Sequence, residues 1–283
     1  MDNKPGSLYI VSTPIGNLND ITNRAIEILN KVDICASEDT RKSIKLFNVN
    51  NISTKLISYH KFSEKTKTKK IISEIVAGKD VALISDAGTP LISDPGKYLV
   101  NAAIEKGIEV VPIPGVSSVI TALSVSGFNL DKFKFFGFLP RKKKERESVI
   151  EEISSSGTTT VIFESGKRLE NLLNEFSKQL PEDTQILVAR EMTKIHETYY
   201  RGNTAKVIDE LNASEFGAKG EFVIIISDFK RLLDIDFSVE DKRIMDILYK
   251  ELPQKEALSL ASQILNKKRN FLYRKKLESN KVN

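Results

Sequence analysis

This sequence of 283 residues has little of several residue types: one cysteine, two histidines and no tryptophan. Because Cys35 is the single cysteine, an intramolecular disulfide is excluded. Zinc sites are usually built from several cysteines and histidines, so we expect no metal. No run approaches the roughly 18–20 apolar residues that span a bilayer. The amino terminus lacks a basic segment followed by an apolar core. We therefore expect a cytoplasmic protein that does not contact a membrane.

The charge balance permits an anionic partner. Lysine and arginine number 43 against 38 acidic residues, for a net charge of +5. Two basic clusters lie close together near the end of the chain, at residues 267–269 and 274–276. Asymmetric basic charge favours nucleic acid over a small neutral ligand. The length is sufficient for two domains with a small appendage.

The most informative segment is residues 81–96, where a short apolar run enters a loop of small residues. Val81 to Ile84 predicts a buried parallel strand. The next residues are Asp, Gly, Thr, Pro and Ser, a composition that predicts an ordered loop up to a helix near Lys97. Open α/β sheets bind ligands at the carboxyl ends of their strands. The loop is therefore either a ligand-binding segment or a tight structural turn.

Two further strands run into similar loops. Leu8 to Thr13 precedes Pro14-Ile-Gly-Asn-Leu18, and Glu109 to Ile113 precedes Pro114-Gly-Val-Ser-Ser118. Since carboxyl ends of parallel strands meet at one sheet edge, the three loops together favour one shared cleft.

The alternation of apolar segments predicts an α/β fold with two α/β domains and a cleft between them. Strands and helices alternate through residues 1–118, which favours a parallel sheet. In this region Asp20 is expected to cap a helix. Residues 119–231 predict a second α/β domain, with a strand at 159–163, a loop at 164–168 and a helix at 169–180.

The tail, residues 232–283, predicts a small helical domain. Helices are expected over 240–251 and 254–265, followed by a third that begins with Lys267-Lys268-Arg269. A helix, a turn and a basic helix match the outline of a helix-turn-helix, which would bind RNA. A helical cap on the second domain fits the same pattern.

Several long motifs, taken in order, resemble a known family. They are Pro14-Ile-Gly-Asn-Leu18, Glu38-Asp-Thr-Arg41, Ser85-Asp-Ala-Gly-Thr-Pro-Leu-Ile-Ser-Asp-Pro-Gly96, Pro114-Gly115, Gly137-Phe-Leu-Pro140 and Lys219-Gly-Glu221. The chain resembles the bacterial 16S rRNA cytidine 2′-O-methyltransferases of the tetrapyrrole methylase superfamily, over about residues 8–273. Two segments depart from the family. Gly166-Lys167 stands where the family often has Pro or Thr followed by His, which argues against an essential imidazole there. Residues 252–257 read Leu-Pro-Gln-Lys-Glu-Ala, where the family more often has an apolar residue and a second Ala.

The resemblance implies S-adenosylmethionine as the cofactor, 16S rRNA in the small ribosomal subunit as the partner, and a homodimer. It also implies cofactor contacts from both domains. Those expected are Pro14, Ile15, Gly16, Asp86, Ala87, Gly88, Thr89, Pro90, Ser117, Ser118, Phe163, Ala189 and Glu221.

Methyl transfer to a hydroxyl can be assisted by a nearby base. The candidates are Glu38, Asp39 and Glu164, and the sequence does not choose among them. Asp39 and Glu164 are equally compatible with capping a helix. Basic residues expected to hold RNA phosphates are Arg141, Lys142, Arg168 and Lys194 around the cleft, and Lys267, Lys268 and Arg269 in the tail.

Two other functions compete with RNA methylation. A small-molecule methyltransferase acting on a tetrapyrrole would share the cleft, although the basic tail speaks against it. A noncatalytic RNA-binding protein of ribosome assembly would retain the cleft without binding cofactor. Dehydrogenases and P-loop enzymes are disfavoured because neither glycine-rich fingerprint occurs.

Overall fold

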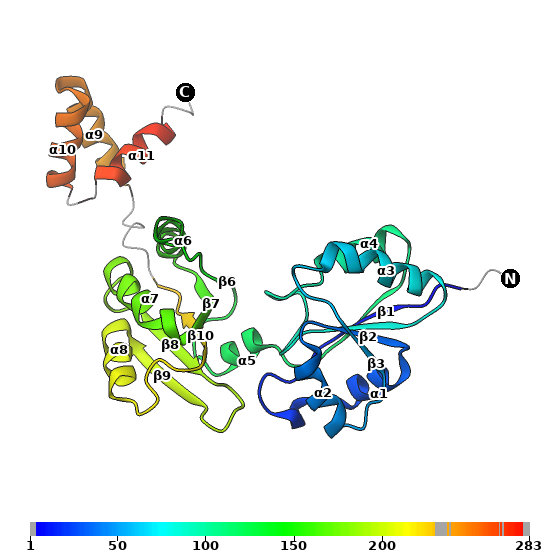
Figure 1. Cartoon of the computed structure of the whole chain (residues 1–283). Helices are drawn as coiled ribbons and strands as arrows, with labels where there is room; N and C mark the ends of the chain where they lie inside the picture. Colours follow the sequence, from blue (N-terminus) through cyan, green and yellow to red (C-terminus); the bar gives the residue numbers. More distant parts are fainter. Residues whose placement is uncertain (1–3, 230–236, 238, 266, 268, 280–283) are drawn as a thin grey trace. The chain divides into compact units, whose positions relative to one another are not determined.

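The computed structural model describes residues 4–229, 237, 239–265, 267 and 269–279. They form two compact units, one of residues 1–150 and 158–228 and the other of residues 151–157 and 229–283. Both α/β regions expected from the sequence lie in the first unit (Figure 1). The domain boundaries at 118 and 231 stay predictions.

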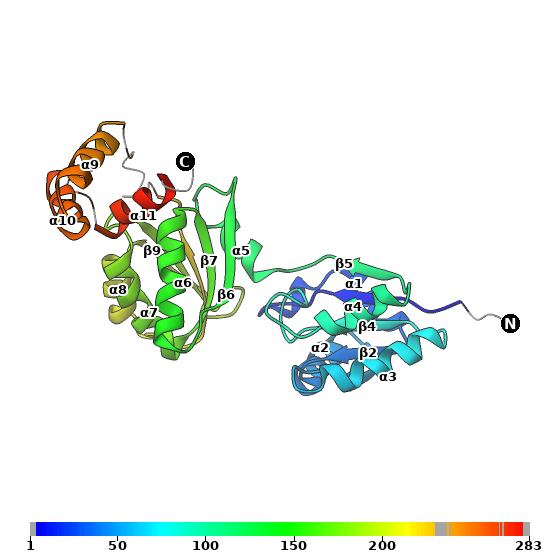
Figure 2. The same cartoon turned by 90° about the horizontal axis from the view of Figure 1, so that it is seen from above.

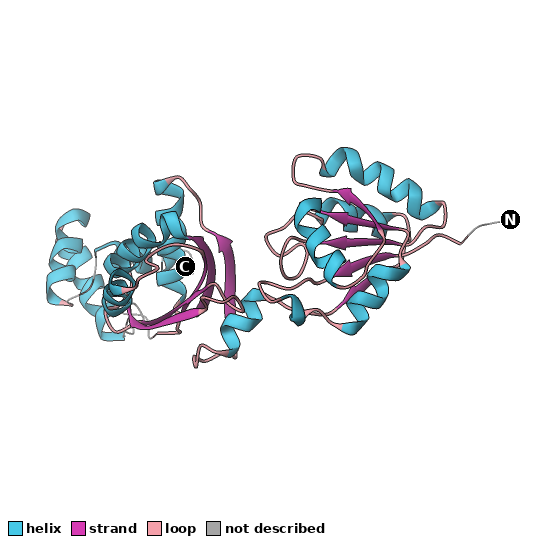
Figure 3. Cartoon of the chain, turned by 60° about the horizontal axis from the view of Figure 1, so that its bottom comes forward, coloured by secondary structure: helices cyan, strands magenta, loops and turns pink. Residues whose placement is uncertain are grey.

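The first sheet has five parallel strands in the order β3-β2-β4-β1-β5. Helices cover both of its faces (Figure 3), α3 and α4 on one and α1 and α2 on the other. This burial on both faces explains the continuous apolar runs in its strands. The strands are β1 (Leu8–Val11), β2 (Ile34–Ser37), β3 (Lys55–Ser58), β4 (Val81–Ile84) and β5 (Val110–Ile113). The helices are η1 (Leu18–Asp20), α1 (Asn23–Lys31), α2 (Thr40–Val49), α3 (Glu64–Val76), α4 (Lys97–Glu105) and α5 (Ser118–Ser124).

One helix cap differs from the prediction. Thr22, not Asp20, caps α1, because the Thr22 hydroxyl accepts the N–H of Ala25 at 3.1 Å. Asp20 ends the short helix η1 instead.

The second sheet has the order β6-β7-β10-β8-β9, with β6 parallel to β7 and the remaining pairs antiparallel. Helices α6, α7 and α8 accompany this sheet (Figure 2). Alternate residues of its strands, such as Val161 and Leu187, pack with Val119 and Leu123 of α5. The strands are β6 (Phe133–Phe138), β7 (Thr159–Ser165), β8 (Gln185–Arg190), β9 (Thr198–Asn203) and β10 (Glu221–Ile226). The helices are α6 (Lys143–Ser156), α7 (Gly166–Gln179) and α8 (Thr204–Ala213).

The predicted loop at 164–168 is wrong. Strand β7 continues to Ser165, which pairs with Glu221 of β10, and α7 begins at Gly166. The turn can be this tight because the Gly166 N–H donates to the Gly220 carbonyl at 3.2 Å and Gly166 carries no side chain. A Cβ there would stand 1.8 Å from the Ala218 carbonyl oxygen.

The second unit contains α9 (Val239–Glu251), α10 (Gln254–Ile264) and α11 (Arg269–Ser279). Met245, Ala261 and Leu272 form its small core, so the helical tail expected from the sequence is present. Among the described residues, no helix has both the length and the apolar composition needed to cross a bilayer.

Candidate active site

Loops from both sheets of the first unit line a pocket of about 680 Å³. This volume is typical of small-molecule and cofactor sites. The segments after β1, β2, β4 and β5 contribute Pro14, Ile15, Gly16, Leu18, Glu38, Lys42, Asp86, Ala87, Thr89, Ile92, Ser93, Asp94, Ser117 and Ser118. The second sheet contributes Phe138, Phe163, Glu164, Ser165, Ala189, Glu191, Met192, Lys194, Glu221, Phe222 and Val223.

All but two of the residues proposed to contact the cofactor line this pocket. The exceptions, Gly88 and Pro90, are buried and are not among the lining residues. Gly88 exchanges two backbone hydrogen bonds of 2.9 Å with Thr13, which joins the loop after β4 to the loop after β1. Gly88 adopts a φ of +78°, a conformation that L side chains rarely take. Its role in the structure is to hold the two loops together.

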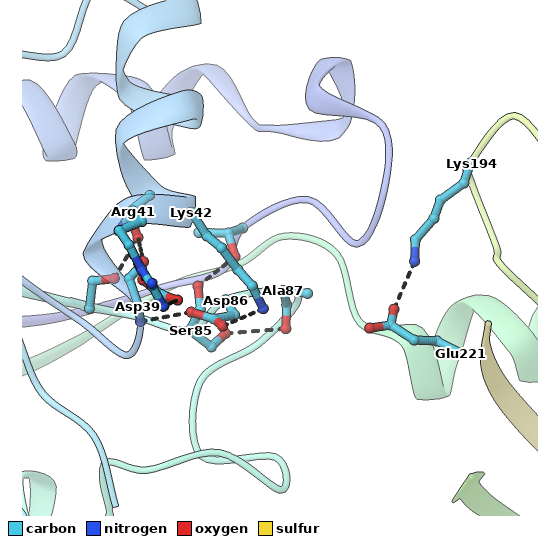
Figure 4. A network of polar contacts seen from close by, with 11 residues as sticks. Asp39, Arg41, Lys42, Ser85, Asp86, Ala87, Lys194 and Glu221 are labelled. Carbon is cyan, nitrogen blue, oxygen red and sulfur yellow. Dashed lines mark hydrogen bonds and ion pairs between the residues drawn. The ribbon is translucent and has the colours of Figure 1, made fainter. Parts of the chain in front are cut away.

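Asp86 connects the loop after β4 to the start of α2 (Figure 4). One carboxylate oxygen accepts the backbone N–H of Asp39 at 2.9 Å, and the other accepts the Lys42 ammonium at 2.7 Å. The hydrogen bond to Asp86 raises the pKa of Lys42. Asp86 therefore fixes the first-sheet side of the pocket with a charge-assisted pair.

The Asp39 side chain stabilises the start of α2. Its carboxylate caps α2 by accepting the Arg41 N–H at 3.0 Å, and it also pairs with the Arg41 guanidinium. The side-chain hydrogen bond from Arg41 lowers the pKa of Asp39 to about 2. Asp39 does not line the pocket. This combination suits a helix cap better than a base.

Two other carboxyl groups of the pocket, Glu38 and Asp94, are harder to ionise than usual. Burial raises the pKa of Asp94 to about 7, and the Glu38 and Asp86 carboxylates add to the shift. Burial, followed by Asp86, raises the pKa of Glu38. Lys42 is the cation that opposes both shifts. The pocket therefore concentrates negative charge on this side.

Asp94→Asn is expected to make the protein more stable at alkaline pH. An unfolded Asp ionises near its ordinary value of 3.8, so the shift to about 7 makes wild-type stability fall as pH rises from about 4 to 7. The asparagine removes this penalty. Urea unfolding at pH 8 should show a gain of about 1–2 kcal/mol, allowing for solvent screening, and little difference near pH 4. An equal gain at both pH values would contradict this origin.

Glu164 is the most enclosed carboxylate of the pocket, with 2 % of its surface exposed. Its Oε1 accepts the Ser165 N–H at 2.7 Å and the Arg168 Nε–H at 2.8 Å. Its Oε2 is buried and has no protein partner. Arg168 also donates to the Leu139 carbonyl at 3.1 Å, so the guanidinium is itself held. Glu164 is thus fixed at the wall of the pocket, with one buried oxygen that has no protein donor.

Lys194 closes the second-sheet side of the pocket. Its ammonium lies 2.8 Å from the Glu221 carboxylate (Figure 4) and 3.0 Å from that of Glu191. The Asn17 N–H donates to the Thr193 hydroxyl at 3.1 Å, which joins the loop after β1 to the turn after β8.

Gly16→Ala is expected to weaken cofactor binding about three- to tenfold. A Cβ at Gly16 would lie 2.5 Å from Lys194 Cγ and 2.7 Å from Thr193 Oγ1, so the turn that meets this loop must move. Calorimetric titration measures the affinity. Gly6→Ala is the matched control, because its Cβ would meet the Lys79 carbonyl oxygen at 2.0 Å, away from the pocket. It should lower stability and leave affinity unchanged; a similar loss of affinity in both variants would contradict the prediction.

The basic residues proposed to bind RNA occupy different environments. Arg141 and Lys142 are exposed, and Lys142 pairs with Glu145 at 2.9 Å. In the second unit, Lys267 forms an ion pair with Asp241 and is largely buried. Arg269 is exposed and donates to the Ser259 hydroxyl at 2.5 Å. Lys268 lies outside the described residues.

Several pocket residues were not proposed from the sequence. They include Leu18, Lys42, Phe138, Ser165 and Met192. Lys42 could have been proposed from the sequence, since it follows Asp39 by about one helical turn at the start of α2. Phe138 ends β6, and Met192 follows β8. Both reach the pocket because of the way the strands of the second sheet pair, which a single sequence does not show. Among the described residues, no group of three or more histidine, cysteine or acidic side chains could hold a metal ion.

Comparison with known proteins decides the family. The model of the tetrapyrrole (corrin/porphyrin) methylases matches residues 7–208. The chain belongs to this family. It is 42 % identical over 272 residues to the ribosomal RNA small subunit methyltransferase I of Vibrio cholerae, covering 96 % of this chain and 94 % of the relative. The relative of the same name from Escherichia coli O157:H7 is 40 % identical, with coverages of 98 % and 96 %.

Solved structures share the fold. Cobalt precorrin-4 methyltransferase aligns with a TM-score of 0.60 at 18 % identity, over 78 % of this chain and 94 % of its own. The uroporphyrin-III-C-methyltransferase of Thermus thermophilus aligns with a TM-score of 0.54 at 18 % identity, over 79 % and 94 %. The predicted fold class is confirmed. The cofactor of the family is S-adenosylmethionine, so this expectation is also confirmed.

The pocket residues fit this cofactor. S-adenosylmethionine carries an ammonium and a sulfonium, and six carboxyl groups line the pocket against two ammonium groups of the protein: Glu38, Asp86, Asp94, Glu164, Glu191 and Glu221 against Lys42 and Lys194. Ala87 is exposed in the lining and carries only a methyl group, so a ligand can approach the backbone there. Ser117, at the start of α5, makes no side-chain capping bond with that helix. The lining thus offers acceptors and space where a cationic cofactor needs them.

Proposed function

We propose that the protein transfers a methyl group from S-adenosylmethionine to the ribose 2′-oxygen of a cytidine in 16S rRNA of the small ribosomal subunit. The observation that carries the proposal is Glu164, a buried carboxylate that lines the pocket, is held by Ser165 and Arg168, and keeps one oxygen without a protein donor. The names of the relatives support the RNA substrate. The cytidine and the ribose position rest on the motifs that the chain shares with that family.

Glu164 is the proposed base among the three candidates. Bound S-adenosylmethionine supplies a methyl group already activated by its sulfonium. As the hydroxyl oxygen forms its bond to the methyl carbon, the carbon–sulfur bond breaks and the hydroxyl proton becomes strongly acidic. The Glu164 carboxylate, paired with Arg168, can then accept that proton at Oε2. Much of the rate enhancement comes from alignment, which can supply roughly 7–11 kcal/mol.

Other residues have proposed roles in binding. The lining residues of the first-sheet loops, Asp86 among them, hold the cofactor together with Phe163, Ala189 and Glu221. Arg141, Lys142, Arg168 and Lys194 are proposed to hold RNA phosphates, and Arg269 of the second unit, which is exposed, is proposed to add to them. We further propose a homodimer, on the resemblance to the family alone.

The acidic lining disfavours a tetrapyrrole as substrate. Tetrapyrroles of this class carry several carboxylates, which the pocket would repel, whereas a ribose hydroxyl brings no charge to the reacting position. An absorbance titration with an anionic porphyrinoid should therefore show no binding. Saturable binding would revive the tetrapyrrole alternative.

The test is methyl incorporation from labelled S-adenosylmethionine into small ribosomal subunits that lack the modification. After digestion of the RNA to nucleosides, the label is expected on the 2′-oxygen of a cytidine. Label on a base, or on another nucleoside, would contradict the proposal. No incorporation despite intact cofactor binding would favour a small-molecule acceptor, and no cofactor binding would leave a noncatalytic RNA-binding protein.

A further inference from the structure

Five residues form an exposed patch of aromatic and basic side chains on the first unit: Lys61, Phe62, Lys65, Lys97 and Tyr98. We call it the aromatic–basic patch. Phe62, in the loop between β3 and α3, is 96 % exposed, and Tyr98 at the start of α4 is 49 % exposed. All three lysines are exposed. A single exposed aromatic residue is ordinary, but two aromatic rings among three lysines are a distinct surface.

The patch is held by specific contacts. Glu64 is buried, and its Oε1 accepts the Gly96 N–H at 2.7 Å, which fixes the start of α3 against the start of α4. The Lys65 ammonium lies 5.7 Å from the centre of the Tyr98 ring. The His60 ring meets Phe62 edge-on with centroids 6.3 Å apart. The rings and cations of the patch therefore come from segments that are fixed to one another.

The patch adjoins the candidate active site. It consists of residues of the loop after β3 and the start of α3 together with the first two residues of α4, at the carboxyl edge of the first sheet, where the pocket-lining loops also lie. The segment that ends at Gly96 contributes Ile92, Ser93 and Asp94 to the pocket. His60, between β3 and α3, lies near enough to Glu38 to oppose in part the rise that burial causes in the pKa of that carboxyl. A polymer with one unit in the pocket would pass close to the patch.

The pocket and the aromatic–basic patch differ in the sign of their charged groups. Carboxyl groups dominate the pocket, so it repels the phosphates that flank a target nucleotide. Those phosphates need cations outside the pocket, and the patch supplies three. Aromatic rings beside lysines are the pattern that binds single-stranded nucleic acid, with bases stacked on the rings.

We propose that the aromatic–basic patch binds the single-stranded RNA next to the target nucleotide, with Phe62 stacked on an unpaired base and the lysines beside phosphates. This inference rests on the proposed RNA substrate. The inference assigns a second contact surface, outside the cofactor pocket, and an unpaired RNA segment as the ligand of that surface.

The test measures binding of a fluorescein-labelled single-stranded RNA that copies the sequence around the methylated cytidine, by anisotropy without cofactor. Phe62→Ala is expected to weaken binding about tenfold, whereas Phe62→Trp should preserve it because it keeps a stacking face. Phe62→Leu should bind as weakly as the alanine variant. Lys61→Ala and Lys65→Ala should each reduce the dependence of affinity on salt.

The control is Ile104→Ala, which removes another exposed apolar side chain, 62 % exposed, at the end of α4 opposite to Tyr98. It should bind RNA as the wild type does. Phe62→Ala should also bind S-adenosylmethionine normally in calorimetry and raise KM for small subunits without lowering kcat. Wild-type affinity of Phe62→Ala, or wild-type affinity of Phe62→Leu, would overturn stacking by Phe62.

The experiments distinguish failure of the RNA-binding patch from failure of the proposed methyl transfer. Ribose methylation by the wild type together with unchanged RNA binding by Phe62→Ala would overturn the patch and leave the methyltransferase intact. Tight RNA binding that depends on Phe62, without any ribose methylation, would support the patch and overturn the proposed reaction.

Discussion

Glu164→Gln is expected to slow methyl transfer about 100- to 1,000-fold without changing the affinity for S-adenosylmethionine by more than about twofold. The geometry fixes the orientation of the new amide. The Ser165 N–H and the Arg168 Nε–H both donate to the position of Oε1, so the amide oxygen must lie there. The amide NH2 then takes the position of Oε2. The pocket would present a donor where the substrate hydroxyl needs an acceptor.

The measurement is single-turnover transfer of labelled methyl to small subunits at saturating cofactor. Glu175→Gln is the matched control, since Glu175 forms a comparable pair with Arg146, at 2.6 and 2.7 Å, outside the pocket. Both variants lose a charge from a glutamate–arginine pair, and both should lose some stability. Only Glu164→Gln should lose the rate. A rate within threefold of the wild type would exclude Glu164 as the proton acceptor.

The sequence predicted the first sheet well because both of its faces are covered. Each strand contains a short apolar run, and the runs of β1, β4 and β5 end in loops of small residues. These strands and the edge at which the pocket lies therefore have local signals in the sequence. The prediction failed at 164–168, where glycine and charged residues resemble a loop. Pairing of Glu164 with Phe222, which is distant in sequence, extends the strand through this segment.

The second sheet shows why part of the site could not be predicted. Strand β9, Thr198–Asn203, was missed because its polar residues lack a regular apolar alternation, and α8 was missed with it. The turn from Glu191 to Lys194 reaches the pocket because β9 pairs with β8. Contacts such as Asn17 with Thr193 join segments 176 residues apart and have no signal in a single sequence.

The choice among the candidate bases also depends on contacts that a single sequence does not show. From the sequence, Glu38, Asp39 and Glu164 were each an acidic residue after a strand, and nothing local ranked them. The structure separates them through partners. Both oxygens of Asp39 face Arg41, Glu38 lies among other carboxyl groups, and Glu164 alone of the three has a buried oxygen without a partner.

Asp86→Ala is expected to weaken binding of S-adenosylmethionine about 10- to 100-fold while the protein remains folded. The substitution removes a pocket carboxylate that faces a cationic ligand, and it also releases the Asp39 N–H and the Lys42 ammonium. Loss of hydrogen bonds to a charged group accounts for about 1.5–3 kcal/mol, which corresponds to this range. Calorimetric titration measures the affinity, and urea unfolding measures the stability.

Asp80→Ala separates the two effects. Asp80 resembles Asp86 because its carboxylate accepts a backbone N–H from a distant segment, that of Ser7 at 2.8 Å, but it precedes β4 and does not line the pocket. Both variants lose a buried link between two segments of the first sheet, so both should lose stability. Only Asp86→Ala should lose cofactor affinity. Equal affinities in the two variants would make Asp86 a purely structural residue, and the acceptor for the cofactor would then have to be sought among Glu38, Asp94 and Glu221.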